Sequence, residues 1–200
     1  MDLFFLRHAS AGDPDPRQDY DERRALNDAG IEQCSLAAFA LESFGAELEC
    51  IYSSPLRRSW QTAEIVAAHL GLGKLIQRAD SLAPLGTYQG FLQLLEECGD
   101  REAVLFVGHN SNLREYMGKL LGSGLPAALH LKKGGLAKLR RDDRRTVLQW
   151  CVTPKLLRTL APTAAYRALP DLSARRNGNR RASTSARPRS WPRSRAKVKA

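Results

Sequence analysis

Short apolar runs alternate with amphipathic stretches over roughly the first 120 residues of the chain. The runs Leu3–Leu6, Cys50–Tyr52 and Ala103–Val107 show no polar alternation, which is typical of strands buried on both faces of a parallel sheet. Between them, apolar residues recur every three or four positions, the spacing of an amphipathic helix. This order predicts an α/β fold. The expected helices are Asn27–Gly45, Ser54–Leu70, Phe91–Cys98 and Leu113–Leu121.

Particular residues mark where two of these helices begin and end. Asn27 is suited to cap the first, because its side-chain oxygen can accept a hydrogen bond from a free backbone N–H of the first turn. Ser54 is predicted to cap the second, with Pro55 at the first helical position. Gly71 should end that second helix.

A further group of strands is expected closer to the C-terminus. The candidates are Leu129–Leu131, Leu136–Arg140 and Val147–Val152. Asp142 and Asp143 predict a turn between the last two strands. Pro154 ends this pattern, and the leucines that follow it predict a final short helix.

The formal net charge of +10 is concentrated at the C-terminal end of the chain. Residues 175–200 contain ten basic side chains and no acidic one, which leaves 21 basic and 21 acidic residues in 1–174. The charge therefore does not indicate a basic groove on the folded part. With almost no aliphatic side chains, 175–200 is expected to be a disordered basic tail after a linker at 161–174. Residues 1–160 are long enough to form one domain.

Composition excludes several other classes of protein. The four cysteines contain no C-x-x-C pair, so they predict buried free thiols in a reducing compartment rather than a zinc or redox motif. No apolar run approaches the ~18 residues of a membrane span. Residues 1–6 lack the basic segment with which a signal peptide begins. A cytoplasmic protein without a membrane partner is expected.

Two histidines directly follow predicted buried strands. His8 and His109 lie at strand carboxyl ends, where open α/β sheets form their ligand crevice, so both can face one pocket. Arg58 lies near the start of a helix whose N-terminal amides favour an anion, and it shares a helix face with Thr62. Arg57 lies on another face and is expected in solvent.

Three segments resemble the histidine phosphatase (phosphoglycerate mutase-like) superfamily. Leu6–Ala9 is similar to its Arg-His-Gly/Ala signature, and Val107–Asn110 to its second-histidine segment. Ser54–Thr62 resembles its Ser-Pro-x-x-Arg-Ala-x-Gln-Thr segment, and this alignment places the family arginine at Arg58. Within the superfamily, residues 1–160 are most similar to the short SixA-type phosphohistidine phosphatases. The segments that carry this likeness are Arg24–Gly30, Leu82–Pro84, Leu131–Leu136 and Gln149–Pro154.

The resemblance implies a three-layer sandwich, with a mostly parallel central sheet flanked by helices, and a phosphatase activity. It implies that His8 is the nucleophile and that Arg7, Arg58 and His109 act with it and bind the phosphoryl oxygens. No metal or other cofactor is implied. A phosphohistidine-bearing protein is the implied substrate.

The sequence also bears on how the leaving group of such a reaction could be protonated. Larger superfamily members carry a carboxylic acid that protonates an alcohol leaving group, but Leu82–Gly90 contains no Asp or Glu, and Asp80 is the nearest carboxylate. A phosphohistidine that is protonated at its other ring nitrogen departs as neutral imidazole without a donor at the cleaved nitrogen. We therefore expect phosphoramidates to be preferred over phosphomonoesters.

Alternatives remain at this level. Arg24 can bind phosphate, or it can pair with acidic residues of its own loop. The Arg/His pocket also fits a phosphomonoesterase acting on a small phosphorylated metabolite. The Arg-rich tail could bind nucleic acid or another acidic surface, although Trp191 alone gives little base stacking. We expect a monomer.

Overall fold

The computed structural model describes residues 1–12, 23–122 and 130–161. These residues form one sheet of six strands in the order β3-β2-β4-β1-β5-β6. The strands are β1 (Asp2–Arg7), β2 (Cys50–Ser53), β3 (Ile76–Arg78), β4 (Ala103–Gly108), β5 (Leu136–Arg141) and β6 (Thr146–Val152). The first four in chain order pair in parallel, whereas β5 is antiparallel to β1 and to β6. The predicted linker and basic tail lie outside the described residues, apart from position 161.

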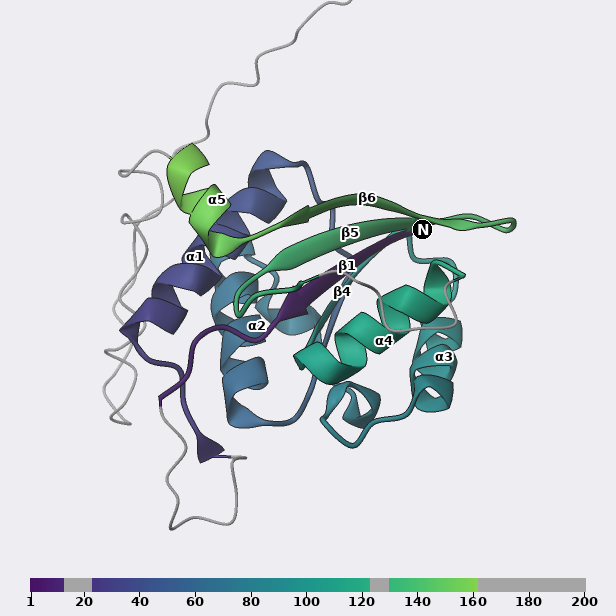
Figure 1. Cartoon of the computed structure of the whole chain (residues 1–200), viewed down its shortest axis with the longest axis horizontal. Helices are drawn as coiled ribbons and strands as arrows, with labels where there is room; N and C mark the ends of the chain where they lie inside the picture. Colours follow the sequence, from purple (N-terminus) through teal and green to yellow (C-terminus); the bar gives the residue numbers. More distant parts are fainter. Residues whose placement is uncertain (13–22, 123–129, 162–200) are drawn as a thin grey trace, which may run out of the picture. The chain divides into compact units, whose positions relative to one another are not determined.

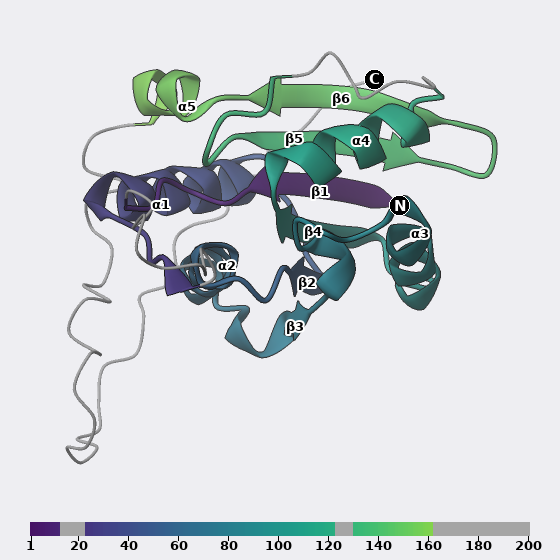
Figure 2. The same cartoon turned by 60° about the horizontal axis from the view of Figure 1, so that its bottom comes forward.

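Helices cover both faces of this sheet. They are α1 (Asp28–Ser43), α2 (Arg57–Leu70), α3 (Tyr88–Glu97), α4 (Asn110–Leu120) and α5 (Pro154–Leu160), with short 3₁₀ turns at η2 (Gly73–Leu75) and η3 (Asp80–Leu82). Figures 1 and 2 show α1, α2 and α5 on one face and α3 and α4 on the other. The α/β class and the three layers are therefore as predicted.

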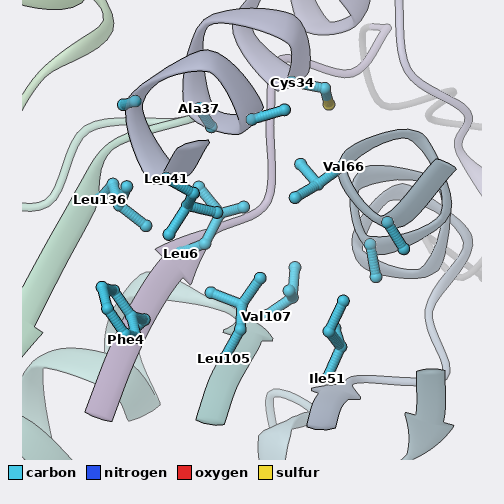
Figure 3. Packing of buried hydrophobic residues seen from close by; sticks show 14 of the residues in the cluster. Phe4, Leu6, Cys34, Ala37, Leu41, Ile51, Val66, Leu105, Val107 and Leu136 are labelled. Atoms are coloured by element: carbon cyan, nitrogen blue, oxygen red, sulfur yellow. The ribbon is translucent and has the colours of Figure 1, made fainter. Parts of the chain in front are cut away.

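Strand β1 explains why its apolar run has no polar alternation. Phe4 and Leu6 point to one face, where Leu41 of α1 and Val66 of α2 belong to the same buried cluster (Figure 3). The alternate residues of β1 belong to a second cluster, with Phe91 of α3. Burying a side chain of this kind stabilises the fold by about 1.5–3 kcal/mol relative to leaving it exposed. Both faces of the central strands are thus core.

Helix ends agree with the sequence at Asn27 and Gly71, but α2, α3 and α4 begin at other residues than expected, α4 at Asn110 and not at Leu113. Asn27 accepts a hydrogen bond from a backbone N–H of the first turn of α1, at 2.9 Å, and Gly71 ends α2 with φ +73°. The prediction that Ser54 caps α2 is wrong, because the helix begins at Arg57 and Ser54 contacts a histidine instead. Helix α3 starts three residues earlier than expected, because Thr87 caps it.

The C-terminal strands are also largely as predicted. Strands β5 and β6 are joined by a turn in which the Asp142 carboxylate accepts two backbone N–H bonds. The predicted strand Leu129–Leu131 is wrong in its described part: His130 and Leu131 are in no strand, and the Leu131 carbonyl accepts a side-chain bond from Arg7 instead of a ladder bond. Strand β3 was missed because it has only three residues, mostly exposed.

Candidate active site

The parallel strands bring distant segments to one edge of the sheet. His8 directly follows β1 and His109 directly follows β4, and these two strands pair in parallel register. The pairing continues past the strand ends, since the His8 N–H donates to the Gly108 carbonyl at 2.9 Å and the Ser54 N–H to the Val107 carbonyl at 3.0 Å. The carboxyl ends of β1, β2 and β4 therefore place these residues side by side.

Arg58 links the two histidines. The ring centroids of His8 and His109 lie 5.0 Å apart. The Arg58 Nε donates to His8 Nε2 at 3.4 Å, and its Nη2 lies 3.3 Å from His109 Nδ1. All three side chains are 4–5% exposed. Arg57 is exposed, as the helix-face argument predicted.

The hydrogen bonds of His8 define its tautomer. Its Nδ1 lies 2.8 Å from the Ala9 carbonyl, which can only accept, so Nδ1 carries the hydrogen in the neutral ring. The lone pair is then on Nε2, where Arg58 donates to it. A neutral imidazole of this form can act as a nucleophile through Nε2.

The hydrogen-bond partners of His109 also define its tautomer. A guanidinium only donates, so His109 Nδ1 accepts from Arg58 and Nε2 carries the hydrogen. Nε2 donates to Ser54 Oγ at 3.0 Å and to Ser59 Oγ at 3.3 Å. Neither serine is predicted as a site residue from the sequence; Ser54, which precedes Pro55, fits a helix cap equally well.

Both histidines are neutral near pH 7. Burial lowers the pKa of His8 to about 4 and that of His109 to about 3. Burial is the largest cause of both shifts; the Arg58 and Arg7 guanidiniums contribute to the lowering of both pKa values, while the bond to the Ala9 carbonyl opposes it at His8. The free lone pair of His8 is therefore retained well below neutral pH.

Arg7 and Arg24 lie close enough for their charges to act on His109. Arg7 is half-buried, burial lowers its pKa, and its Nη1 donates to the Leu131 carbonyl at 3.1 Å. Arg7 Nε is buried without a hydrogen-bond partner among the described residues. Arg24 donates to the Gly12 carbonyl at 3.1 Å; the acidic residues proposed as its partners lie outside the described part of the chain.

Helix α2 also holds the segment that follows β1. The Ala9 N–H donates to Thr62 Oγ1 at 3.1 Å, and the Thr62 hydroxyl donates to the Arg58 carbonyl at 2.7 Å. Gln61 Oε1 accepts from the Leu26 N–H at 2.9 Å. Thr62 therefore fixes the backbone beside His8 to the helix that carries Arg58, and Gln61 fixes Leu26 to the same helix.

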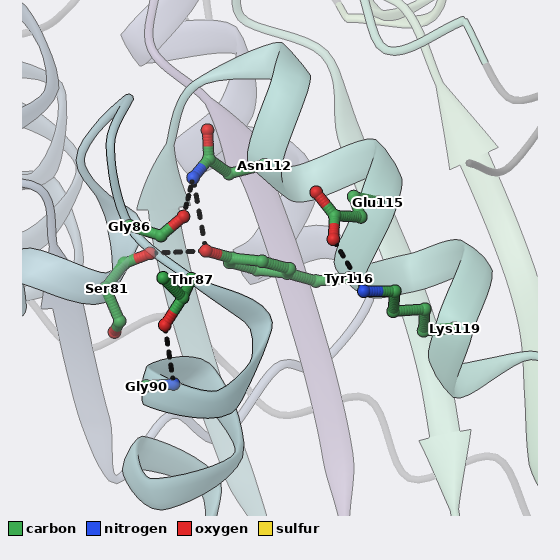
Figure 4. A network of polar contacts seen from close by, with 8 residues as sticks. All are labelled: Ser81, Gly86, Thr87, Gly90, Asn112, Glu115, Tyr116 and Lys119. Atoms are coloured by element: carbon green, nitrogen blue, oxygen red, sulfur yellow. Dashed lines mark hydrogen bonds and ion pairs between the residues drawn. The ribbon is translucent and has the colours of Figure 1, made fainter. Parts of the chain in front are cut away.

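A buried amide of helix α4 holds the segment that follows β3 (Figure 4). Asn112 Nδ2 donates to the Gly86 carbonyl at 2.8 Å and lies 3.1 Å from the Tyr116 hydroxyl, which donates to the Ser81 carbonyl at 2.7 Å. Helix α4 begins directly after His109, so these bonds fix segment 81–86 relative to that ring. Sequence reasoning missed Asn112, whose partners lie about 30 residues away.

The site is electropositive. Arg7, Arg24, Arg58 and Lys133 are all cations, and the charge of each lowers the pKa of one or both rings. Across residues 1–12, 23–122 and 130–161, no cluster of three or more His, Cys, Asp or Glu is arranged to hold a metal ion. Within the same ranges, no helix has the length and apolar character to cross a membrane. The arrangement suits an anion with several oxygens.

Comparisons with known proteins identify the family and the fold. The sequence profile of the histidine phosphatase superfamily (branch 1) matches residues 3–84. An uncharacterized protein of Picosynechococcus sp. is 38% identical over 149 residues, which span 72% of this chain and 88% of that protein. The structure of the protein histidine phosphatase SixA complexed with tungstate is similar at TM-score 0.68 and 25% identity, covering 78% of this chain and 99% of that one.

A phosphoserine phosphatase from Entamoeba histolytica shares the fold alone, at TM-score 0.59 and 16% identity, covering 77% of this chain and 98% of that one. Fold and site together define an α/β enzyme of the phosphatase class. The chain belongs to the histidine phosphatase superfamily, as its three motifs predicted.

Proposed function

We propose that the protein hydrolyses phosphohistidine in a protein substrate, without a metal, through a covalent intermediate on His8. The observation that carries the proposal is the neutral His8 ring, whose Nδ1–H is held by the Ala9 carbonyl and whose Nε2 lies beside Arg58. The likeness to SixA supports the choice of substrate.

The reaction has two steps. His8 Nε2 attacks the phosphorus in line, the bond from phosphorus to the substrate nitrogen breaks, and the electron pair leaves with the substrate imidazole. Water then attacks the phosphorus of phospho-His8, the bond to Nε2 breaks, and the water proton passes to phosphate or solvent. Because the nucleophile is already neutral, no base is needed for the first step.

The cations of the site stabilise the charge that develops on the phosphoryl oxygens. Arg58 has two donor groups directed at the two rings, and a phosphoryl group beside Nε2 would take over those donors. Arg7 and His109 complete the set, with Arg24 as a further phosphate-binding residue. Loss of one such donor typically costs about 10²–10³ in rate.

The leaving group decides between phosphoramidate and ester. Segment 82–90, part of which Asn112 holds, contains no carboxylate, and Asp80 is exposed. An alcohol needs a proton to leave, whereas an imidazole protonated at its distal nitrogen leaves as a neutral ring. The lack of a carboxylate in this segment favours phosphohistidine over a phosphomonoester.

Two measurements test the proposal. Turnover of a phosphohistidine peptide is compared with that of p-nitrophenyl phosphate, and the peptide is expected to give the higher kcat/KM. Equal or better turnover of the ester would favour the alternative, a phosphomonoesterase acting on a small metabolite. Rapid quenching with labelled substrate should place an acid-labile, base-stable phosphate on His8, and the His8→Ala variant should lose it; label elsewhere would refute the mechanism.

A further inference from the structure

Two buried serine hydroxyls hold the ring of His109. Ser54 directly follows β2, and Ser59 lies in the first turn of α2. Their Oγ atoms lie 3.0 Å and 3.3 Å from His109 Nε2, and both serines are fully buried. The Ser54 N–H donates to the Val107 carbonyl, which fixes the end of β2 beside the end of β4. Ser59 stands where the family motif has alanine, so the second hydroxyl belongs to this chain and not to the motif.

The other ring nitrogen of His109 faces the place where the phosphoryl group is transferred. The Arg58 guanidinium bridges the two rings, with Nε 3.4 Å from His8 Nε2 and Nη2 3.3 Å from His109 Nδ1. A phosphoryl group on His8 Nε2 that takes over these donors has its oxygens opposite His109 Nδ1. Ionised phosphoryl oxygens only accept hydrogen bonds, and in the free protein Nδ1 also accepts. His109 can therefore donate to the phosphoryl group only if Nδ1 gains a hydrogen.

The Nδ1 atom can gain a hydrogen in two ways. The ring can become an imidazolium, which burial and the Arg58 charge oppose, since they lower the pKa of His109 to about 3. Alternatively, the ring stays neutral and its hydrogen moves from Nε2 to Nδ1, which requires a donor facing Nε2. A serine hydroxyl can either accept from Nε2–H or donate to Nε2, whereas a carbonyl or a carboxylate can only accept.

Both serine hydroxyls are available as donors. Ser54 Oγ also accepts from the Leu56 N–H at 3.3 Å, and Ser59 Oγ contacts only the ring. Within the part of the chain that the structure describes, neither O–H hydrogen has an acceptor other than His109 Nε2. While Arg58 donates to Nδ1, these two buried hydrogens lack a partner; the other tautomer gives one of them an acceptor.

We propose that Ser54 and Ser59 are positioning residues that let the neutral His109 ring change its tautomer when a phosphoryl group binds. One proton leaves Nε2 for water and one is added to Nδ1 from water, so the charge of the ring does not change. Nδ1–H then donates to a phosphoryl oxygen, and a serine hydroxyl donates to Nε2. The inference rests on the proposed phosphoryl transfer to His8 but not on phosphohistidine as the substrate.

NMR of the full chain labelled with ¹⁵N in histidine tests the change of tautomer, because a ring nitrogen with a hydrogen and one without it differ in chemical shift. Spectra are recorded at pH 7.5 with and without saturating inorganic phosphate, and His109→Gln assigns the signals. His109 is expected as the Nε2–H tautomer alone and as the Nδ1–H tautomer with phosphate. An unchanged tautomer, or an imidazolium with both nitrogens protonated, would overturn the proposal. Signals of both His8 and His109 that phosphate leaves unmoved would refute the phosphoryl site and the proposal with it.

Serine variants test whether the hydroxyls are responsible. In the double variant Ser54→Ala/Ser59→Ala, no hydroxyl can donate to Nε2, so phosphate should no longer produce the Nδ1–H tautomer. Its kcat/KM for a phosphohistidine peptide and for p-nitrophenyl phosphate should fall about 10²-fold, as for loss of one donor to the transferred group. Ser35→Ala is the matched control, because it removes an equally buried hydroxyl whose partner is the Ile31 carbonyl in α1. This control should keep the tautomer change and the wild-type rate.

Thermal unfolding followed by circular dichroism checks that the variants fold. If the double variant does not fold, the two single variants replace it, and each is expected to show less of the Nδ1–H tautomer with phosphate. The full tautomer change in the variants, a wild-type rate, or an equal loss of rate in Ser35→Ala would each overturn the proposal. If the wild type cleaves no phosphohistidine peptide, the proposed substrate fails, while the NMR spectra and the ester still test the serines.

Discussion

Replacing His8 by glutamine should make the stability of the protein less sensitive to acid. The pKa of His8 is about 4 in the folded protein, against 6.5 for an ordinary histidine. In the unfolded chain, the His8 ring therefore binds a proton below about pH 6.5. In the folded protein, the same ring binds a proton only below about pH 4. Stability from this ring is complete above pH 6.5 and is lost as the pH falls from 6.5 towards 4.

The size of the effect follows from the two pKa values. At pH 5 an unfolded histidine is about 1.5 pH units below its pKa, while folded His8 is still largely neutral, so the free energy of unfolding drops by about 2 kcal/mol. His109, with a pKa of about 3, contributes a similar amount, about 2 kcal/mol. The wild type should thus lose about 4 kcal/mol from the pair between pH 7.5 and pH 5, and His8→Gln about half of that.

Urea unfolding at pH 7.5 and pH 5 measures this difference for each variant. The comparison uses the change with pH, so any constant cost of the substitution cancels. His130→Gln replaces an exposed histidine and should leave the pH dependence of the wild type intact. If His8→Gln loses as much stability as the wild type between the two pH values, His8 is not held neutral by burial and the argument for its tautomer fails.

Two further predictions concern segments held next to the two histidines. Asn112→Ala should lower the free energy of unfolding by about 1–3 kcal/mol, because the half-buried carbonyl of Gly86 loses its donor, and it should also reduce kcat, which urea unfolding and steady-state assays measure. An unchanged kcat would show that segment 81–86 does not shape the reaction. Gly134→Ala should destabilise the fold more than Gly45→Ala, as measured by thermal unfolding. Both glycines have positive φ, but a Cβ at Gly134 would lie 2.7 Å from Gln33 Cβ, whereas Gly45 faces open space. Equal losses would contradict the close approach.

The parts of the site that follow from local pattern were predictable from the sequence. His8 and His109 stand directly after apolar runs, and parallel pairing of such runs brings their carboxyl ends together. The position of Arg58 on the buried face of α2 follows from helical periodicity alone. Motif and periodicity agree because both depend on residues that are near one another in the chain.

Other parts depend on contacts between distant segments, which no local pattern contains. Ser54 has the residue type of a helix cap. It accepts a hydrogen bond in the site only because the end of β4 places His109 beside it. From their residue types, Thr87 and Gly90 are typical of a loop. In the structure Thr87 accepts a hydrogen bond from the Gly90 N–H and so caps α3. Lys133 lies more than 120 residues from His8 in the chain, so its proximity depends on the pairing of β5 with β1.

The position of β1 in the sheet has a consequence for synthesis of the chain. Its parallel neighbour begins at Ala103 and its antiparallel neighbour at Leu136, so both are translated long after β1 has left the ribosome. At about 5–20 residues per second, the interval before β4 emerges is on the order of 5–20 s. During this interval the apolar segment Leu3–Leu6 lacks both of its partner strands, and His8 and His109 cannot come together. The nascent polypeptide is therefore inactive, and open to aggregation, until most of the domain has been made.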